Sequence, residues 1–134
     1  MPTNTQPASI SNGALWAGWI ITGLVMLFLA FDGVTKIIKV APVVEASEKL
    51  GVPSHALLGI GVVLLACTAV YAVPQTAVLG AILLTGYLGG AAAIHVRAGS
   101  GAFPIAFSIA FGVLTWVGLV LREPRLLWTI LLRQ

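Results

Sequence analysis

Long apolar stretches alternate with short polar segments along this chain, and the lengths of the apolar stretches predict its secondary structure. The first stretch turns apolar at Leu15 and ends among Asp32 and Lys36. Residues 50–96 contain no Asp, Glu, Lys or Arg, and residues 98–121 contain none either. A helix that crosses the hydrocarbon core of a bilayer needs about 20 residues. The first and last stretches therefore each predict one membrane span.

The middle stretch is too long for a single crossing, and near its centre it carries the turn signal Tyr71-Ala-Val-Pro74-Gln75-Thr76. We interpret it as two spans joined by a tight turn. Short connections favour an up-down-up-down order of antiparallel helices. A cleaved signal peptide is the alternative for the first span, but no Lys or Arg precedes Lys36 to form its positive region. The sequence thus predicts an all-α integral membrane four-helix bundle with spans over 15–36, 55–73, 76–96 and 103–121.

Two other segments are predicted to lie at the membrane surface. Within residues 43–52, Glu45 and Lys49 stand four positions apart, and apolar side chains occupy another face. We expect a short amphipathic interfacial helix here, between the first two spans. The tail over residues 124–134 is apolar on nearly all sides but too short to cross, so we expect it to lie along the surface.

Small residues at helical spacing predict where the spans approach one another. In lipid, helices associate through close backbone contact, and Gly, Ala, Ser and Thr permit it. The candidates are Gly86, Gly90 and Ala93 in the third span, and Ser108, Gly112 and Thr115 in the fourth.

The amino-acid composition also indicates a membrane protein. The chain of 134 residues is long enough for a single domain. It is 59% hydrophobic and 8% charged, whereas about a quarter of a soluble domain is charged. The formal net charge of +3 is small and scattered, which argues against a nucleic-acid partner. Because Cys67 is the single cysteine, the chain has neither a disulfide, nor a Cys-x-x-Cys redox pair, nor a thiolate metal cage, and no metal site is expected.

Orientation is decided by the positive residues at the two membrane faces. With four spans both termini lie on one side. Cytoplasmic loops carry more Lys and Arg than loops on the other side. When Lys36 and Lys39 are assigned to the end of the first helix and not to the loop, the side of the termini has more positive loop residues, which favours cytoplasmic termini. The positive residues divide into Arg122, Arg125 and Arg133 on the side of the termini and Lys36, Lys39, Lys49 and Arg97 on the other.

The remaining polar side chains gather at the membrane face away from the termini. Antiparallel connectivity brings the end of the first span, the start of the second and the end of the third to this face. Ionisable residues beside a span are costly, and they usually face the bundle interior or water. We therefore expect the functional site at this mouth of the bundle. The residues concerned are Asp32, Lys36, His55, His95 and Arg97, with Glu45, Glu48 and Lys49 of the interfacial segment above them.

Three of these residues are candidates for catalysis. Asp32 and Lys36 share one helical face, where they can neutralise each other or meet partners, and His95 can relay protons. The structural alternatives are a local ion pair at a helix end and an interfacial histidine cap. A haem would have only His55 and His95 as axial ligands, and no spacing signature supports one. The candidate ligand-binding residues are Tyr87, Arg97, His55 and Glu48.

Four sequence elements carry a family resemblance. They are Phe31-Asp32-Gly33-Val34-Thr35-Lys36, Leu50-Gly51-Val52-Pro53, Thr85-Gly86-Tyr87-Leu88-Gly89-Gly90-Ala91 running on to His95-Val96-Arg97, and Leu121-Arg122-Glu123-Pro124-Arg125. In this order, over about residues 15 to 127, the chain resembles the DoxX-like membrane proteins. The resemblance implies a four-helix protein of a bacterial inner membrane. It does not imply one activity: a founding member is linked to a thiosulfate to quinone oxidoreductase, and more distant relatives are described as cargo receptors or assembly factors.

Three hypotheses on function follow. The first is a small component of a membrane redox or detoxification system that binds a quinone or another lipophilic molecule within the bundle. The second is a non-catalytic scaffold or assembly partner, whose small residues receive a helix of another membrane protein or of a second copy. The third is an intramembrane acid/base enzyme that uses Asp32 and His95 on an apolar small molecule. Direct thiosulfate chemistry is disfavoured, because the chain has no cysteine pair.

Overall fold

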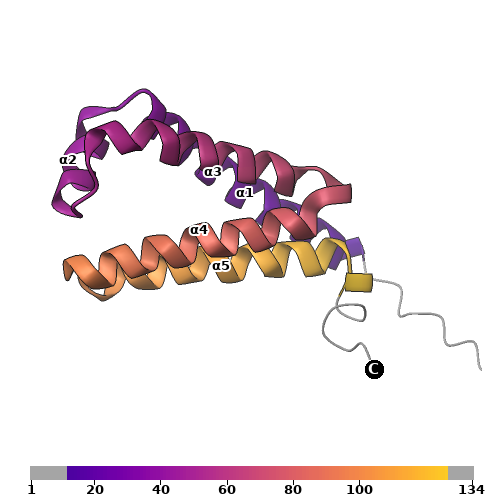
Figure 1. Ribbon diagram of the computed structural model, residues 1–134. Coiled ribbons are helices and arrows are strands. Elements are labelled where there is room, and N and C mark those ends of the chain that lie inside the picture. The colour runs from indigo at the N-terminus through magenta and orange to yellow at the C-terminus, as the bar shows by residue number, and fades with distance from the viewer. Residues whose placement is uncertain (1–11, 127–134) are drawn as a thin grey trace, which may run out of the picture.

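The fold is an all-helical bundle, seen in a computed structural model that describes residues 12–126. Four long helices and one short helix, α2, account for its elements, with single 3₁₀ turns before α3 and α4 (Figure 1). Within the described residues there is no β-strand. The elements are α1 (Asn12–Ile37), α2 (Ala41–Lys49), η1 (Ser54–Ala56), α3 (Leu57–Ala72), η2 (Pro74–Thr76), α4 (Ala77–Ala98) and α5 (Ala102–Arg122).

Four segments are long and apolar enough to cross a membrane. They correspond to the four predicted spans, each with ends shifted by a few residues, so the predicted all-α membrane bundle is confirmed. Part of the predicted surface tail, residues 127–134, lies outside the described residues. The spans are Asn12–Ile37, Ser54–Ala72, Pro74–Ala98 and Ala102–Arg122.

The short helix α2 begins and ends earlier than the predicted 43–52. Pro42 lies in its first turn, where the missing backbone N–H of proline costs no helical hydrogen bond. The helix stops at Lys49 because Gly51 has a φ of 79°, in the left-handed region. Lys39, just before α2, also has a positive φ, of 54°. The backbone is therefore left-handed on both sides of α2.

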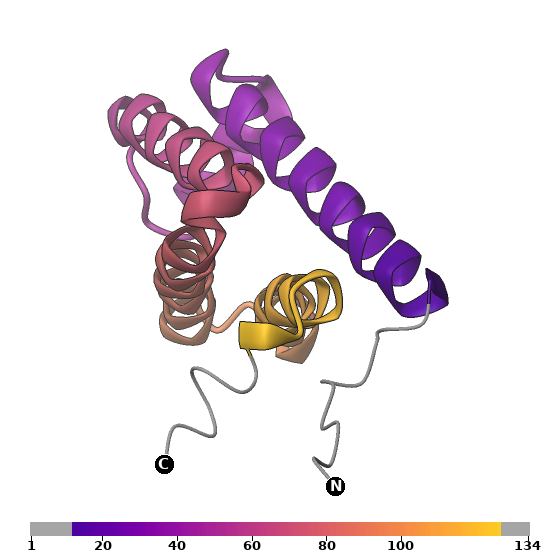
Figure 2. The same cartoon turned by 90° about the vertical axis from the view of Figure 1, so that its right-hand side faces the viewer.

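The four long helices form a ring. Helix α1 packs against α3 and α5, and α4 packs against the same two helices, so that α1 and α4 occupy opposite corners (Figure 2). Both ends of the described chain lie at one end of the bundle, and α2 lies at the other (Figure 1). This is the predicted up-down-up-down order.

Glycines make the closest helix contacts at specific crossings. A Cβ on Gly61 of α3 would lie 2.7 Å from the carbonyl oxygen of Gly33 on α1. A Cβ on Gly118 of α5 would lie 2.7 Å from Thr22 Oγ1 on α1. At Gly80 of α4 the Cβ would collide with the backbone of Tyr71 on α3. At these positions only glycine permits the observed backbone separation.

The predicted contact residues of the third span are wrong. An added Cβ at Gly86 or Gly90 has no heavy atom within 4 Å, and Ala93 is exposed. The reason is that α4 contributes buried residues only as far as Leu88. In the fourth span Ser108 and Thr115 are buried as expected, whereas Gly112 has only an ordinary contact, 4.0 Å, with the Leu88 side chain.

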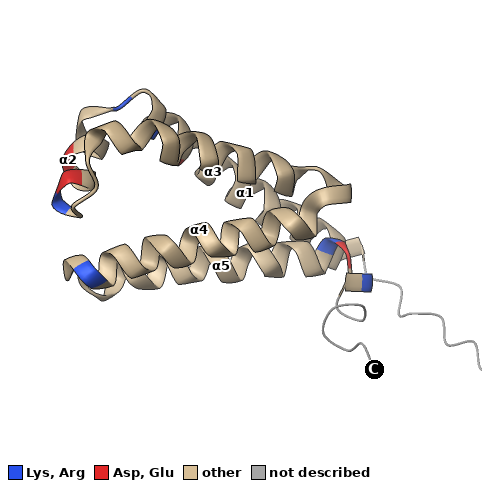
Figure 3. Ribbon diagram, viewed as in Figure 1, with Lys and Arg blue, Asp and Glu red and all other residues tan. Residues whose placement is uncertain are grey.

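Helices α3 and α4 therefore meet near their connecting turn and diverge toward α2 (Figure 1). A hydrogen bond from the Tyr71 hydroxyl to the Thr115 carbonyl oxygen, at 2.7 Å, ties α3 to α5 across the core. We call the half of the bundle that contains Tyr71 the closed end and the half beneath α2 the open end. Lys, Arg, Asp and Glu lie toward the two ends of the bundle, with other residues between them (Figure 3).

Candidate functional site

A cavity of about 640 Å³ lies within the open end. Its walls come from α1, α2, α4 and α5 and from the start of α3. It exists because α4 separates from α3 beyond Leu88 while α2 covers the gap from outside. Most of the lining is apolar, and four of the residues proposed above from sequence, Asp32, Lys36, Tyr87 and His95, are part of it.

An aromatic cluster forms one side of the cavity. Phe28 of α1 lies against Phe111 of α5 with ring centroids 4.5 Å apart, and Phe107 lies 4.7 Å from Phe111. The three rings line the cavity at the α1–α5 contact. Sequence reasoning missed them, although the spacing of Phe103, Phe107 and Phe111, four residues apart, places them on one helical face.

Helix α2 forms the outer wall of the cavity. Its inward positions include Pro42, Val43, Ala46 and Ser47, and Ser47 is buried. The charged residues of α2 are exposed on its other side. The predicted amphipathic character of this segment is therefore seen as an apolar side toward the cavity and a charged side away from it.

An ion pair lies on the α1 wall of the cavity. Lys36 Nζ lies 2.5 Å from Asp32 Oδ2, one helical turn away, and both residues line the cavity. The side chains are 17% and 32% exposed, respectively. The pair places a hydrogen-bond donor and an acceptor of opposite charge beside an apolar space.

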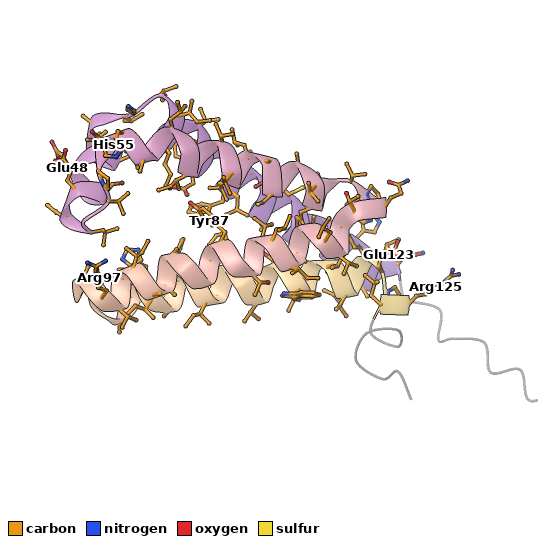
Figure 4. All side chains as sticks on the ribbon, viewed as in Figure 1. Glu48, His55, Tyr87, Arg97, Glu123 and Arg125 are labelled. Atoms are coloured by element: carbon orange, nitrogen blue, oxygen red, sulfur yellow. The ribbon has the colours of Figure 1, made fainter. Side chains whose placement is uncertain are left out.

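Two uncharged polar groups face the cavity from α4. Tyr87 is half-buried and points into the space between α4 and the opposite helices (Figure 4). Its hydroxyl makes no hydrogen bond with residues 12–126. The Nδ1 atom of His95 is buried and also lacks a partner among those residues. Because a buried polar atom is costly without a hydrogen bond, His95 is suited to a polar group of a bound molecule. The Tyr87 hydroxyl offers a second hydrogen-bonding group on the same wall.

The other three predicted ligand-binding residues lie outside the cavity. Glu48 on α2, His55 in η1 and Arg97 near the end of α4 are exposed at the open end (Figure 4). None of them is among the lining residues. Among the described residues, no group of three or more His, Cys, Asp or Glu is placed to hold a metal ion.

Sequence reasoning missed a buried cation at the closed end. Arg122, the last residue of α5, is only 6% exposed. Its guanidinium lies 5.0 Å from the ring centre of Trp19 and 4.9 Å from that of Tyr71, and Nη2 donates a 3.2 Å hydrogen bond to the Tyr71 carbonyl oxygen. A signal was available: Arg122 continues the face that carries Thr115 and Leu119, which are buried.

Taken together, the open end can hold an apolar molecule with a polar group. The aromatic rings and aliphatic side chains offer contact with a hydrophobic body. Tyr87, His95 and Lys36 offer hydrogen-bond donors, and Asp32 offers an acceptor. The four polar residues belong to two spans, α1 and α4, whereas the apolar contacts also come from α2, α3 and α5.

Comparison with known proteins identifies a family. The family model described as the DoxX-like family matches residues 20–118, which include the aromatic cluster, α2 and all the lining residues of the cavity. No curated protein and no solved structure matches the chain. The match covers most of the chain, and the four apolar helices are those of a multi-pass membrane protein. The chain belongs to the DoxX-like family.

Proposed function

We propose that the protein binds a quinone, or a lipophilic molecule of similar shape, within the open end and serves as a small component of a membrane redox or detoxification system. The observation that carries this proposal is the cavity itself: a largely apolar space between candidate membrane-spanning helices, with the buried, unpartnered Nδ1 atom of His95 and the Tyr87 side chain on its α4 wall. We further propose a bacterial inner membrane as its location and a cytoplasmic position for both termini.

The size and lining of the cavity support a ligand of this class. Its volume of about 640 Å³ lies in the range of small-molecule sites, roughly 300–1,000 Å³. A quinone combines an apolar ring and tail with two carbonyl oxygens that accept hydrogen bonds. The Tyr87 hydroxyl would donate to one such oxygen. His95 Nδ1 is buried, so it would donate to the other oxygen after its ring turns toward the ligand, with the tautomer that carries the proton on Nδ1.

The ion pair gives the site a second role. Lys36 and Asp32 form an ion pair without net charge, so an uncharged ligand can enter without contacting an unpaired buried charge. The electrons that reduce a bound quinone would come from a redox partner protein. The reduced quinone would gain negative charge and take up protons, and Lys36 is placed to stabilise the charge and His95 to exchange the proton. These roles assign Asp32, Lys36 and His95 as the catalytic candidates and Tyr87 as a ligand-binding residue.

Thermal unfolding of the detergent-solubilised protein with decylubiquinone tests the proposal. A ligand at about 100 times its dissociation constant stabilises the folded state by about 2.7 kcal/mol, so a rise of several degrees in the unfolding temperature is expected. Lys36→Ala and His95→Ala are expected to remove most of this rise. Glu123→Gln, which changes a charge at the closed end, is the matched control and should keep it.

Two results would contradict this assignment. If the quinone left the unfolding temperature of the wild-type protein unchanged, quinone binding would be excluded. If the rise survived in both cavity variants but disappeared in His55→Ala or Arg97→Ala, the ligand would bind at the exposed rim and not in the cavity.

Acid/base catalysis on an apolar small molecule is a second candidate, favoured by the presence of Asp32 and His95 on the same cavity. Turnover that is lost in Asp32→Asn while the ligand still binds would support it. The scaffold hypothesis would gain support if the wild-type protein bound no small molecule and crosslinked to a membrane partner or a second copy in native membranes.

A further inference from the structure

Three glycines of α4 have open space beside them. An added Cβ at Gly86, Gly89 or Gly90 has no heavy atom within 4 Å. Glycine in a helix interior is less stable than alanine, because its unfolded backbone has more freedom to lose. At Gly80, in the same helix, a close backbone contact explains the glycine. No contact of the described residues explains the other three.

Two of these glycines line the cavity and the third does not. Gly86 and Gly90 are one helical turn apart on the same face of α4 and both belong to the cavity wall. All three glycines are exposed, but Gly89 is not among the residues that line the cavity. The empty space at Gly86 and Gly90 is therefore part of the cavity, whereas that at Gly89 is outside it.

The surroundings of the two cavity glycines indicate what fills this space. Phe28 belongs to α1, at the corner of the bundle opposite α4, and packs against Phe111 of α5. The cavity thus has aromatic rings on one side and bare backbone on another. The polar groups on the glycine side are the Tyr87 hydroxyl and His95 Nδ1, which is buried without a hydrogen-bond partner among the described residues.

We infer that the face formed by Gly86 and Gly90 is a flat floor on which a planar ring rests, so that these glycines select a ring-bearing ligand over one with only a flexible chain. The inference rests on the proposed ligand site and narrows its ligand class. A flat ring can approach a bare backbone closely and stack on aromatic side chains at its other surface. Ring oxygens at its edge then reach Tyr87 or His95.

Three single substitutions of the same kind test the inference. Gly86→Ala and Gly90→Ala each add one methyl group to the cavity wall, and Gly89→Ala adds one outside it. All three variants should fold and unfold at the same temperature as the wild type or about 2 °C above it, because alanine favours the helix. Decylubiquinone should bind about tenfold more weakly to the first two variants and unchanged to Gly89→Ala. Oleic acid, a probe without a ring, serves for comparison, and its affinity should change little in any variant.

The outcomes separate this inference from the proposal on which it rests. If wild type and all three variants bound decylubiquinone equally well, the proposed function would stand and the glycine floor would be wrong. Equal weakening in Gly89→Ala would also overturn the floor, because the effect would not come from the cavity wall. An equal loss of oleic acid binding in Gly86→Ala and Gly90→Ala would show that the glycines provide volume without selecting a ring. If the wild type bound no quinone at all, both the proposed function and the ring-binding floor would be overturned.

Discussion

Gly80→Ala is expected to destabilise the protein by about 3 kcal/mol, a large effect for the addition of one methyl group. The added Cβ would collide with the Cα and N atoms of Tyr71. These are backbone atoms of α3, so no side-chain rotation relieves the clash and the two helices must separate. Such a separation would also disturb the hydrogen bond from the Tyr71 hydroxyl to the Thr115 carbonyl oxygen.

The measurement is thermal unfolding in one detergent, with Gly86→Ala as the matched control. Both variants replace glycine by alanine in α4, and only the first meets a neighbouring helix. A substantially lower unfolding temperature is expected for Gly80→Ala, and an equal or higher one for Gly86→Ala. Equal unfolding temperatures for Gly80→Ala and wild type would show that the closed end tolerates a wider helix separation than the structure contains.

Arg122→Ala is expected to destabilise the protein by about 2–4 kcal/mol. The arginine side chain fills the space between Trp19 and Tyr71, and it is only 6% exposed. Truncation to alanine leaves a void at the closed end and removes the hydrogen bond to the Tyr71 carbonyl oxygen. The expected result is a lower unfolding temperature and a loss of monodisperse protein on gel filtration.

Arg122→Met distinguishes packing from charge at this position. Nε and Nη1 of Arg122 are buried and have no hydrogen-bond partner among the described residues, which makes the charge itself costly. Methionine keeps most of the side-chain volume and removes that charge. We expect Arg122→Met to be within about 1 kcal/mol of wild type, or more stable. If Arg122→Met were as damaging as Arg122→Ala, the guanidinium contacts with Trp19 and Tyr71 would dominate over side-chain volume.

Charge-free stretches were sufficient to predict the spans. Every predicted span overlaps an observed one, because a bilayer requires long apolar segments and leaves few alternatives. The position of the polar cluster was also predictable from the order of the helices. The sequence placed Asp32, Lys36 and His95 near one mouth of the bundle and named Tyr87 as a candidate ligand-binding residue. The structure lines one cavity with all four.

The packing of particular residues could not be predicted in the same way. The spacing of Gly86 and Gly90 shows that another helix could approach there, but not that one does. A helix contact at Gly86 and Gly90 depends on how far α3 and α4 diverge. These helices are in close contact at Gly80, which is more than one helical turn from Gly86. The cavity also has no recognisable sequence motif, because it results from the separation of helices that are distant in the sequence. Arg122 was counted only as a positive charge on the side of the termini, and its burial was not predicted, although its position on α5 continues a buried face.

The division of the bundle into a closed and an open end has a consequence for evolution within the family. The glycine crossings at Gly80 and Gly118 and the Tyr71 hydrogen bonds lie at or toward the closed end, and at the open end the Gly33–Gly61 crossing joins α1 to α3. Most of the cavity wall is formed by residues that take no part in those contacts. Substitutions in the wall can therefore accumulate with little effect on folding. A membrane scaffold built in this way can exchange one ligand for another over a few mutations, which would allow proteins of the same architecture to diverge in activity.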